Sequence, residues 1–203
     1  MFTGIIEHLG TIESLERDAE KARLVIEIQG ECEPVAPGES IAVNGVCLTA
    51  LAQGQRAFAV DLSTETLRRT SFGTVQEGAV VNIERSLTPQ KKMSGHFVMG
   101  HVDAVGRIES MDHKPGEILI RVSHPADLTP NFIEKGSVAL DGISLTVFDC
   151  RDGAFTVSII PFTWEHTNLN EKQPGVPVNL ECDMIGKYIL KACEPLIQRG
   201  RSE

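Results

Sequence analysis

The stretch MFTGIIEHLGTIES at residues 1–14 returns as FVMGHVDAVGRIES at residues 97–110. Three later stretches of the first half return in the same order. They are SIAVNGVCLT (40–49) as SVALDGISLT (137–146), FAVDLSTETLRRT (58–70) as FTVSIIPFTWEHT (155–167), and VNIE (81–84) as VNLE (178–181). Because all four blocks keep one order and nearly one offset, the sequence predicts two tandem copies of one domain.

The repeat divides the chain of 203 residues into 1–96 and 97–203. Each part is close to the usual size of a domain, so each is long enough to bury its own core. The repeat begins at Met1 itself, and we expect no removable leader before the fold. A duplicated domain also offers two similar pockets, which suits two copies of one ligand.

Charge and composition exclude several classes of partner. The net charge is −9 and the isoelectric point is about 5.2, which argues against nucleic acid and against an anionic membrane surface. No signal peptide and no apolar run of membrane-spanning length is visible, so we expect a cytoplasmic protein. The five cysteines are scattered without a CxxC motif, which predicts neither a disulfide framework nor a zinc site.

Short runs rich in β-branched residues, separated by turn formers, recur in both copies. They lie at 24–28, 58–62 and 80–84, and again at 118–122, 138–140 and 155–159. This spacing predicts about six strands per copy in a small barrel or sandwich, and closure into a barrel would remove exposed sheet edges. Residues 63–69 and 161–166 interrupt the pattern as expected helical turns, and 85–95 is expected to link the domains.

The tail beyond the repeat has helical periodicity. Asp183 is a suitable N-cap, and Pro195 is expected to kink or end the helix. Its apolar stripe comprises Met184, Ile185, Tyr188, Ile189, Ala192, Cys193, Leu196 and Ile197. Two interpretations remain open: the helix docks on its own barrel, or it mediates self-association. We favour self-association, since a closed pair of barrels needs no lid.

Standard catalytic signatures are absent from the sequence. It contains no GxGxxG, Walker A, HExxH or GxSxG motif. His96 and His101 are five positions apart, which on a strand would direct them to opposite faces, so we expect no metal site.

Comparison of the two copies separates shared from divergent positions. Shared positions such as Gly4/Gly100, Thr49/Thr146 and Thr66/Thr163 suit the fold or recognition of a common ligand, although threonines also simply favour strands and caps. Divergent positions suit whatever makes the copies unequal: Cys47/Ser144, Ile5/His101, Asp61/Ser158 and Glu65/Phe162. Taken alone, Cys47 would be a small buried residue and His101 a structural one.

Five sequence motifs, in a fixed order along the chain, point to one protein family. MFTGII at the N-terminus, NGVCLT at 44–49, SGHFVMGHVD at 94–103, DGISLT at 141–146 and VNLECD at 178–183 resemble the riboflavin synthase family of the α-chain type over essentially the whole chain. The resemblance implies an all-β fold with a C-terminal helix: two tandem six-stranded Greek-key barrels related by pseudo-two-fold symmetry. It also implies a homotrimer held by C-terminal helices, and it leaves open association with lumazine synthase.

The implied reaction is the dismutation of two 6,7-dimethyl-8-ribityllumazine molecules, without metal or organic cofactor. One molecule gives a four-carbon unit to the other, which yields riboflavin and 5-amino-6-ribitylaminouracil. The family places its active site between the N-terminal barrel of one subunit and the C-terminal barrel of its neighbour. Two oriented substrates react in an effectively unimolecular step.

The resemblance also implies the site residues. The first pocket is expected to contain Gly4, Ile5, Ile6, Ser40, Cys47, Leu48, Thr49, Asp61, Leu62, Ser63, Thr64, Glu65 and Thr66, with Phe2 packing near the reacting rings. The second is expected to contain Gly100, His101, Val102, Lys135, Ser144, Leu145, Thr146, Ser158, Ile159, Ile160, Pro161, Phe162 and Thr163, and His96 is a further substrate-binding candidate. For catalysis we select Cys47, His101, Ser144 and Asp183. A histidine suits proton transfer from the 7-methyl group, and a thiol or hydroxyl suits the nucleophile.

Other functions fit less well. A relative that only binds lumazine or flavin as an optical antenna would lack the reactive side chains that this chain retains. A flavin-binding module of a reductase would need a nicotinamide-binding partner domain, and no βαβ pattern is visible. A purely structural role would leave the divergent polar positions unexplained.

Overall fold

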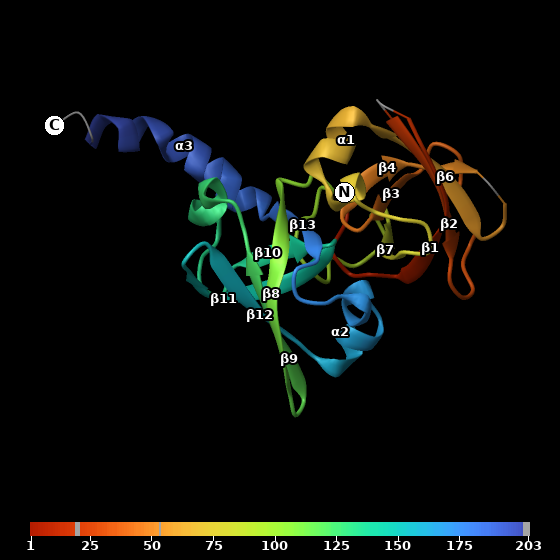
Figure 1. Cartoon of the computed structure of the whole chain (residues 1–203). Coiled ribbons are helices and arrows are strands. Elements are labelled where there is room, and N and C mark those ends of the chain that lie inside the picture. Colours follow the sequence, from red (N-terminus) through yellow and green to blue (C-terminus); the bar gives the residue numbers. More distant parts are fainter. Residues whose placement is uncertain (19–20, 53, 201–203) are drawn as a thin grey trace.

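The computed structural model of the chain describes residues 1–18, 21–52 and 54–200 and shows two β-barrels side by side, with one long helix projecting from the second (Figure 1). The fold predicted from the repeat and the family resemblance is therefore confirmed. The connection between the barrels runs from Arg85 to Ala104 and contains the expected linker and the division at 96/97.

The described residues of the first barrel form seven strands. They are β1 (His8–Arg17), β2 (Lys21–Ile28), β3 (Ser40–Val43), β4 (Val46–Thr49), β5 (Leu51–Ala52), β6 (Ala57–Ser63) and β7 (Val80–Arg85). Their order is β4-β3-β7-β1-β2-β6-β5, with antiparallel pairing throughout. Since β4 and β5 are two parts of one stretch interrupted at Ala50, the ring is nearly closed and corresponds to six strands.

The second barrel is closed, in the order β10-β11-β12-β9-β8-β13. Its strands are β8 (Ala104–Lys114), β9 (Glu117–Ser123), β10 (Ser137–Leu140), β11 (Ile143–Arg151), β12 (Ala154–Ile159) and β13 (Pro177–Cys182). Here β11 is continuous where the first copy has β4 and β5. Each barrel encloses its own apolar core, as alternating inward side chains dictate.

Short helices fill the connections. They are α1 (Thr64–Arg69), η1 (Ser71–Gly73), η2 (Ala126–Asn131), α2 (Pro161–Glu165) and η3 (Asn168–Glu171). Both expected helical turns are confirmed. The first begins at Ser63, whose hydroxyl accepts from the Thr66 amide, and the second begins at Pro161, which suits the first position of a helix.

The long helix is α3 (Met184–Gly200). The amide of Ile185 donates to the Asp183 carboxylate at 3.0 Å, so the predicted N-cap is confirmed. The helix continues through Pro195, so the alternative that Pro195 ends it is wrong. Pro195 removes one amide donor from the helix, and its ring crowds the carbonyl of Lys191 four residues earlier, at a cost of about 3 kcal/mol.

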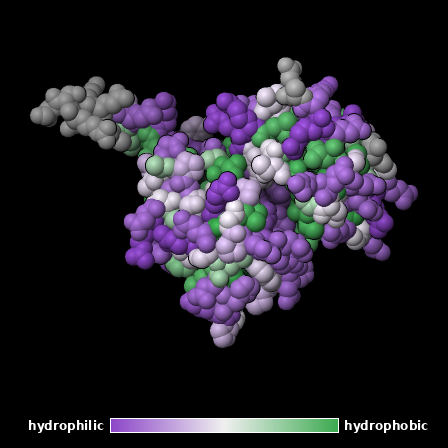
Figure 2. All heavy atoms as spheres, viewed as in Figure 1, coloured by the Kyte–Doolittle hydropathy of each residue, from purple (hydrophilic) through white to green (hydrophobic). Residues whose placement is uncertain are grey.

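The apolar face of α3 is exposed along its first half. Ile185, Tyr188 and Ile189 are 54%, 70% and 58% exposed, and apolar residues gather where α3 leaves the barrel (Figure 2). The side chains of Leu196 and Ile197, which we also placed on this stripe, lie outside the described part. Among the described side chains of this face, Ile185, Tyr188 and Ile189 are therefore not covered by the chain's own barrel.

Candidate functional site

Segments that precede the first strand of each copy cross to the other barrel. The amide of Ser144 on β11 donates to the Gly4 carbonyl at 2.8 Å, and the amide of Cys47 on β4 donates to the Gly100 carbonyl at 2.8 Å. Ile6 packs on the core of the second barrel, and Val102 packs on the core of the first. The two crossings are equivalent by the repeat.

This crossing corrects the expected grouping of residues. We assigned Gly4, Ile5 and Ile6 to the pocket of Cys47, and Gly100, His101 and Val102 to the pocket of Ser144. The structure exchanges the two triplets. Repeat matching locates a segment within its copy but carries no information about which barrel that segment packs against.

Glycine is required at both crossings. Gly4 and Gly100 have φ of +76° and +78°, and a Cβ on them would lie 2.6 Å from Ser144 Cβ and 2.5 Å from Cys47 Cβ. A side chain would therefore be strained by its backbone and would also displace the neighbouring strand.

Two buried carboxylates fix the crossing segments. Glu84 accepts from the Thr3 amide and hydroxyl (2.7 and 2.8 Å) and from the Gly4 amide (2.9 Å). Glu181 accepts from the amides of Met99, Gly100 and His101 at 2.7, 2.8 and 3.0 Å.

Burial raises the pKa of both the Glu84 and Glu181 carboxyls, and these amide donors partly oppose the shift. A lysine assists each carboxylate. Lys91 bonds to Glu7 and lies 3.7 Å from Glu84, and Lys187 bonds to Asp103 beside Glu181.

The first pocket consists of two adjoining cavities of about 450 and 270 Å³ that share Cys47 and Thr66. Their lining is Val46, Cys47, Leu48, Thr49, Leu51, Asp61, Ser63, Glu65, Thr66, Arg69, Thr70, Gly100, His101, Val102 and Asp103. The structure thus brings together most of the residues expected at a ligand site on this barrel, including Cys47 and His101. Their combined volume is that of a small-molecule site.

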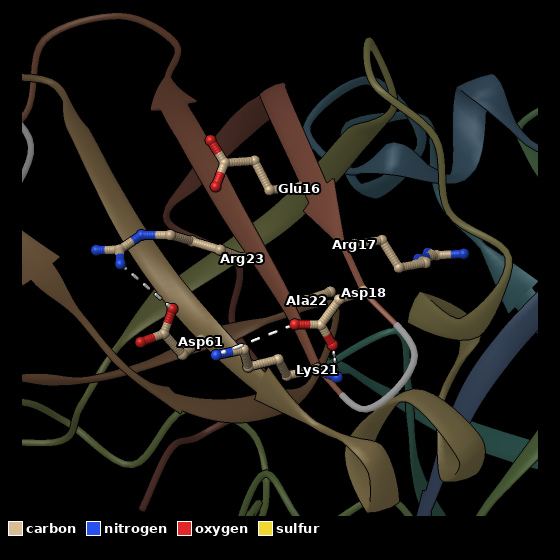
Figure 3. Close-up of a pocket in the computed structure, with 7 residues that line it drawn as sticks. All are labelled: Glu16, Arg17, Asp18, Lys21, Ala22, Arg23 and Asp61. Atoms are coloured by element: carbon tan, nitrogen blue, oxygen red, sulfur yellow. Dashed lines mark hydrogen bonds and ion pairs between the residues drawn. The ribbon is translucent and has the colours of Figure 1, made fainter.

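A further hollow of about 410 Å³ adjoins this pocket at Asp61. Glu16, Arg17, Asp18, Lys21, Ala22 and Arg23 line the rest of it (Figure 3). Arg23 lies 3.8 Å from Asp61 across the β2–β6 pair, so the carboxylate at this end of the pocket has a cationic neighbour.

The second site centres on Ser144 and His96. Nδ1 of His96 lies 2.7 Å from the Ser144 hydroxyl, while Nε2 is buried and bonds to nothing among the described residues. Burial lowers the His96 pKa, and the Asp183 carboxylate acts in the opposite direction. A neutral imidazole beside a hydroxyl can accept its proton, an arrangement that suits a nucleophile or a group that orients water.

The four residues selected for catalysis therefore form two groups within one chain. Cys47 lies with His101, which also borders a hollow with Met99, Met184, Lys187, Tyr188 and Lys191. Ser144 lies with His96, and Asp183 caps α3 close by. His96 and His101 both lie in the interbarrel connection and not on a strand, which corrects the premise that placed them on opposite faces.

Several residues expected to contact the ligand are buried or lie on strands where their side chains point away from the pocket. Phe2 is fully buried and packs with Val98, Ala42 and Ala139 beneath Cys47, so it supports the site without offering a face to a ligand. Leu62 and Ile159 point into the cores, and a ligand would meet their backbone only. Ser40 lies opposite Thr49 in the β3–β4 pair.

The remaining candidates lie on the second barrel and its connections, except Thr64, which belongs to the first copy. Lys135 lies in the loop before β10, with its ammonium 5.2 Å from the Phe148 ring centre. Phe162 is 66% exposed and stacks on His166 at 4.0 Å, where the first copy has Glu65 paired with Arg68 and Arg69. The others are Leu145 and Thr146 on β11, Ser158 at the end of β12, Ile160 after it, and Pro161 and Thr163 in α2; Thr64 begins α1.

No group of three metal-ligating side chains lies together among the described residues. None of the described helices is both long and apolar enough to cross a membrane.

Known proteins resemble the chain in sequence and in fold. A model of the lumazine binding domain matches residues 3–86 and again 99–183. Proteins named riboflavin synthase are 41% identical over 94% of this chain and 89% of the relative in Bacillus subtilis, and 43% identical over 93% and 88% in Actinobacillus pleuropneumoniae. The crystal structure of LumP complexed with riboflavin superposes with a TM-score of 0.81 at 21% identity, covering 90% of this chain and 99% of LumP.

Proposed function

The chain belongs to the riboflavin synthase family, and on that premise we propose that it dismutates two molecules of 6,7-dimethyl-8-ribityllumazine. A four-carbon unit passes from one molecule to the other, giving riboflavin and 5-amino-6-ribitylamino-2,4(1H,3H)-pyrimidinedione. The products contain every atom of the two substrates, so no oxidant, reductant or resident cofactor is consumed. The observation that supports this most directly is the pair of lumazine-binding repeats, which match residues 3–86 and 99–183.

Two equivalent pockets that are chemically unequal suit this reaction. Both reactants are the same molecule, so both pockets need the same recognition, which the repeated glycines and threonines can supply. One reactant must nevertheless donate and the other accept. The Cys47 thiol and the exposed His101 imidazole face one ring. The Ser144 hydroxyl and the buried His96 imidazole face the other.

The acid–base roles follow from these environments. A neutral His96 can hold the Ser144 proton while the hydroxyl, or a water that it orients, adds at C7 of one ring. His101 beside Cys47 can exchange the proton of the 7-methyl group of the other ring. Asp183 caps α3, and its charge partly opposes the lowering of the His96 pKa by burial, so it stabilises an imidazolium when one forms.

A homotrimer completes the proposed site. Within one chain the two catalytic groups lie on different barrels, so face-to-face substrates require the first barrel of one subunit and the second barrel of another. The exposed stripe of Ile185, Tyr188 and Ile189 is suited to helix–helix contact between subunits. We further propose a cytoplasmic location and leave association with lumazine synthase as a secondary proposal.

The test is incubation of ligand-free protein with 6,7-dimethyl-8-ribityllumazine, followed by absorbance and chromatography. We expect one riboflavin for every two lumazines consumed, without added metal. Fluorescent binding without turnover would overturn the enzymatic proposal and favour a lumazine-binding antenna.

A further inference from the structure

The two barrels differ near the ends of the equivalent strands β6 and β12. Asp61 on β6 and Ser158 on β12 are equivalent positions of the repeat. In the first barrel Asp61 lines the pocket and lies 3.8 Å from Arg23. In the second barrel Ser158 has no carboxylate of its own.

A carboxylate nevertheless occupies this position in the second barrel. The Ser158 hydroxyl donates to Oε2 of Glu117 at 2.5 Å. Glu117 is the first residue of β9, which pairs with β12. Ile118 lies opposite Ile159 in this antiparallel pair, so Glu117, one residue earlier, lies opposite Ile160. The equivalent position in the first barrel is Lys21, which lies opposite Ser63, the counterpart of Ile160.

The exchange reverses the local charge. The first barrel combines Asp61 with Arg23 and Lys21, whereas the equivalent positions of the second barrel are Ser158, Leu119 and Glu117. The first set carries one net positive charge and the second one net negative charge. In the described part of the second barrel, the Glu117 carboxylate bonds to Ser158 and to no cation.

We propose that Glu117 is a positioning residue of the second pocket, where its carboxylate, held by Ser158, accepts a hydrogen bond from a hydroxyl of the ribityl chain. It takes there the part that Asp61 takes in the first pocket. Ser158 uses its single proton to orient Glu117, so the second carboxylate oxygen is left to receive a hydroxyl donor from the ligand. This inference rests on the proposed function.

The difference also distinguishes the two copies of the substrate. A carboxylate without a cationic neighbour accepts a hydroxyl bond more strongly than Asp61 does, because the positive charge of Arg23 at 3.8 Å weakens the negative potential at the Asp61 oxygens. The polyol tail is therefore held by an unpaired acceptor in the second pocket and by a paired acceptor in the first.

The test measures binding of 6,7-dioxo-8-ribityllumazine, which lacks the methyl groups and cannot react, and of its 8-methyl counterpart without the polyol. For Glu117→Gln we expect about ten- to hundredfold weaker binding of the ribityl ligand at one class of site, the size of a lost charge-assisted bond. The 8-methyl ligand should bind within twofold of wild type. Asp112→Asn, an exposed carboxylate of the same hairpin, is the matched control and should change neither affinity.

A double variant separates positioning from structure. Glu117→Ala with Ser158→Asp returns the carboxylate to the strand on which the first barrel carries it, and we expect it to recover most of the ribityl affinity. Equal weakening of both ligands by Glu117→Gln, no weakening of either, or no recovery in the double variant would overturn the inference. Wild-type turnover is assayed separately, so a protein that binds the ribityl ligand without converting lumazine contradicts only the proposed function.

Discussion

Asn82 and Asn179 hold equivalent places in the two barrels, and each donates its side-chain amide to the opposite half of the molecule. Nδ2 of Asn82 donates to the Asp141 carbonyl at 3.0 Å, and Nδ2 of Asn179 donates to the Asn44 carbonyl at 2.8 Å. Both asparagines are fully buried. The seam between the barrels is thus a reciprocal polar network, and it fixes the relative position of the two pocket faces.

Replacing Asn82 by Ala should destabilise the whole chain. The variant leaves the Asn168 amide and the Asp141 carbonyl without their partner in a dry environment, which costs about 2–4 kcal/mol of unfolding free energy. Chemical denaturation measures the loss. Gln29→Ala removes an exposed amide that bonds to Thr11 and should cost less than about 0.5 kcal/mol; similar losses in the two variants would contradict the role of the seam.

Gly100→Ala should lower activity more than a glycine-to-alanine change at another position with a left-handed backbone. The new methyl group would lie 2.5 Å from Cys47 Cβ and would shift β4 and Cys47 together. We expect kcat/KM for the lumazine reaction to fall by at least about tenfold, since small displacements of reacting groups are costly. Gly30→Ala is the matched control, because Gly30 has φ of +80° and open space around its Cβ position. It should lose about 1 kcal/mol of stability and retain activity.

The pH dependence of kcat/KM should reflect the protonation of His96. Its pKa lies below the usual 6.5 because burial disfavours the imidazolium, so the catalytically competent neutral form persists as the pH falls below 6.5. We expect the acid limb of kcat/KM to have its midpoint below 6.5. His96→Gln should remove this limb and reduce kcat by about 10²–10⁴. An acid limb unchanged in the variant would assign it to another group.

The same shift makes a prediction about stability. A histidine whose pKa is lowered in the folded state stabilises the fold above its unfolded pKa, and this contribution is lost as the pH falls through the folded value. Wild type should therefore lose more unfolding free energy between pH 7 and pH 5 than His96→Gln does. Thermal unfolding of the two proteins across that range measures the difference.

Local alternation and turn residues predicted about six strands per copy, in a barrel or a sandwich, and both short helices, whereas the choice of barrels came from the family resemblance. It did not predict the crossing of Gly4 and Gly100 between barrels, since that contact joins residues distant in the chain. It also did not predict that His96 Nδ1 lies 2.7 Å from the Ser144 hydroxyl. Comparison of the copies could not reveal His96, because the residue precedes the second repeat and its counterpart would precede Met1. The sequence signal that included His96 was the motif SGHFVMGHVD at 94–103, and His96 was expected only as a substrate-binding candidate.

The exposed face of α3 should control assembly and, through it, activity. Ile189→Asp places a charge on a face that is apolar and solvent-exposed in the single chain, so the folded subunit should keep its stability while the helix contact between subunits is lost. We expect sedimentation velocity to show monomers and turnover to fall at least about tenfold, since each proposed site needs two subunits. Glu194→Gln, on the polar side of α3, is the control and should remain assembled. A monomeric Ile189→Asp protein with full turnover would show that one chain holds a complete site, and it would refute the division of the catalytic groups between subunits.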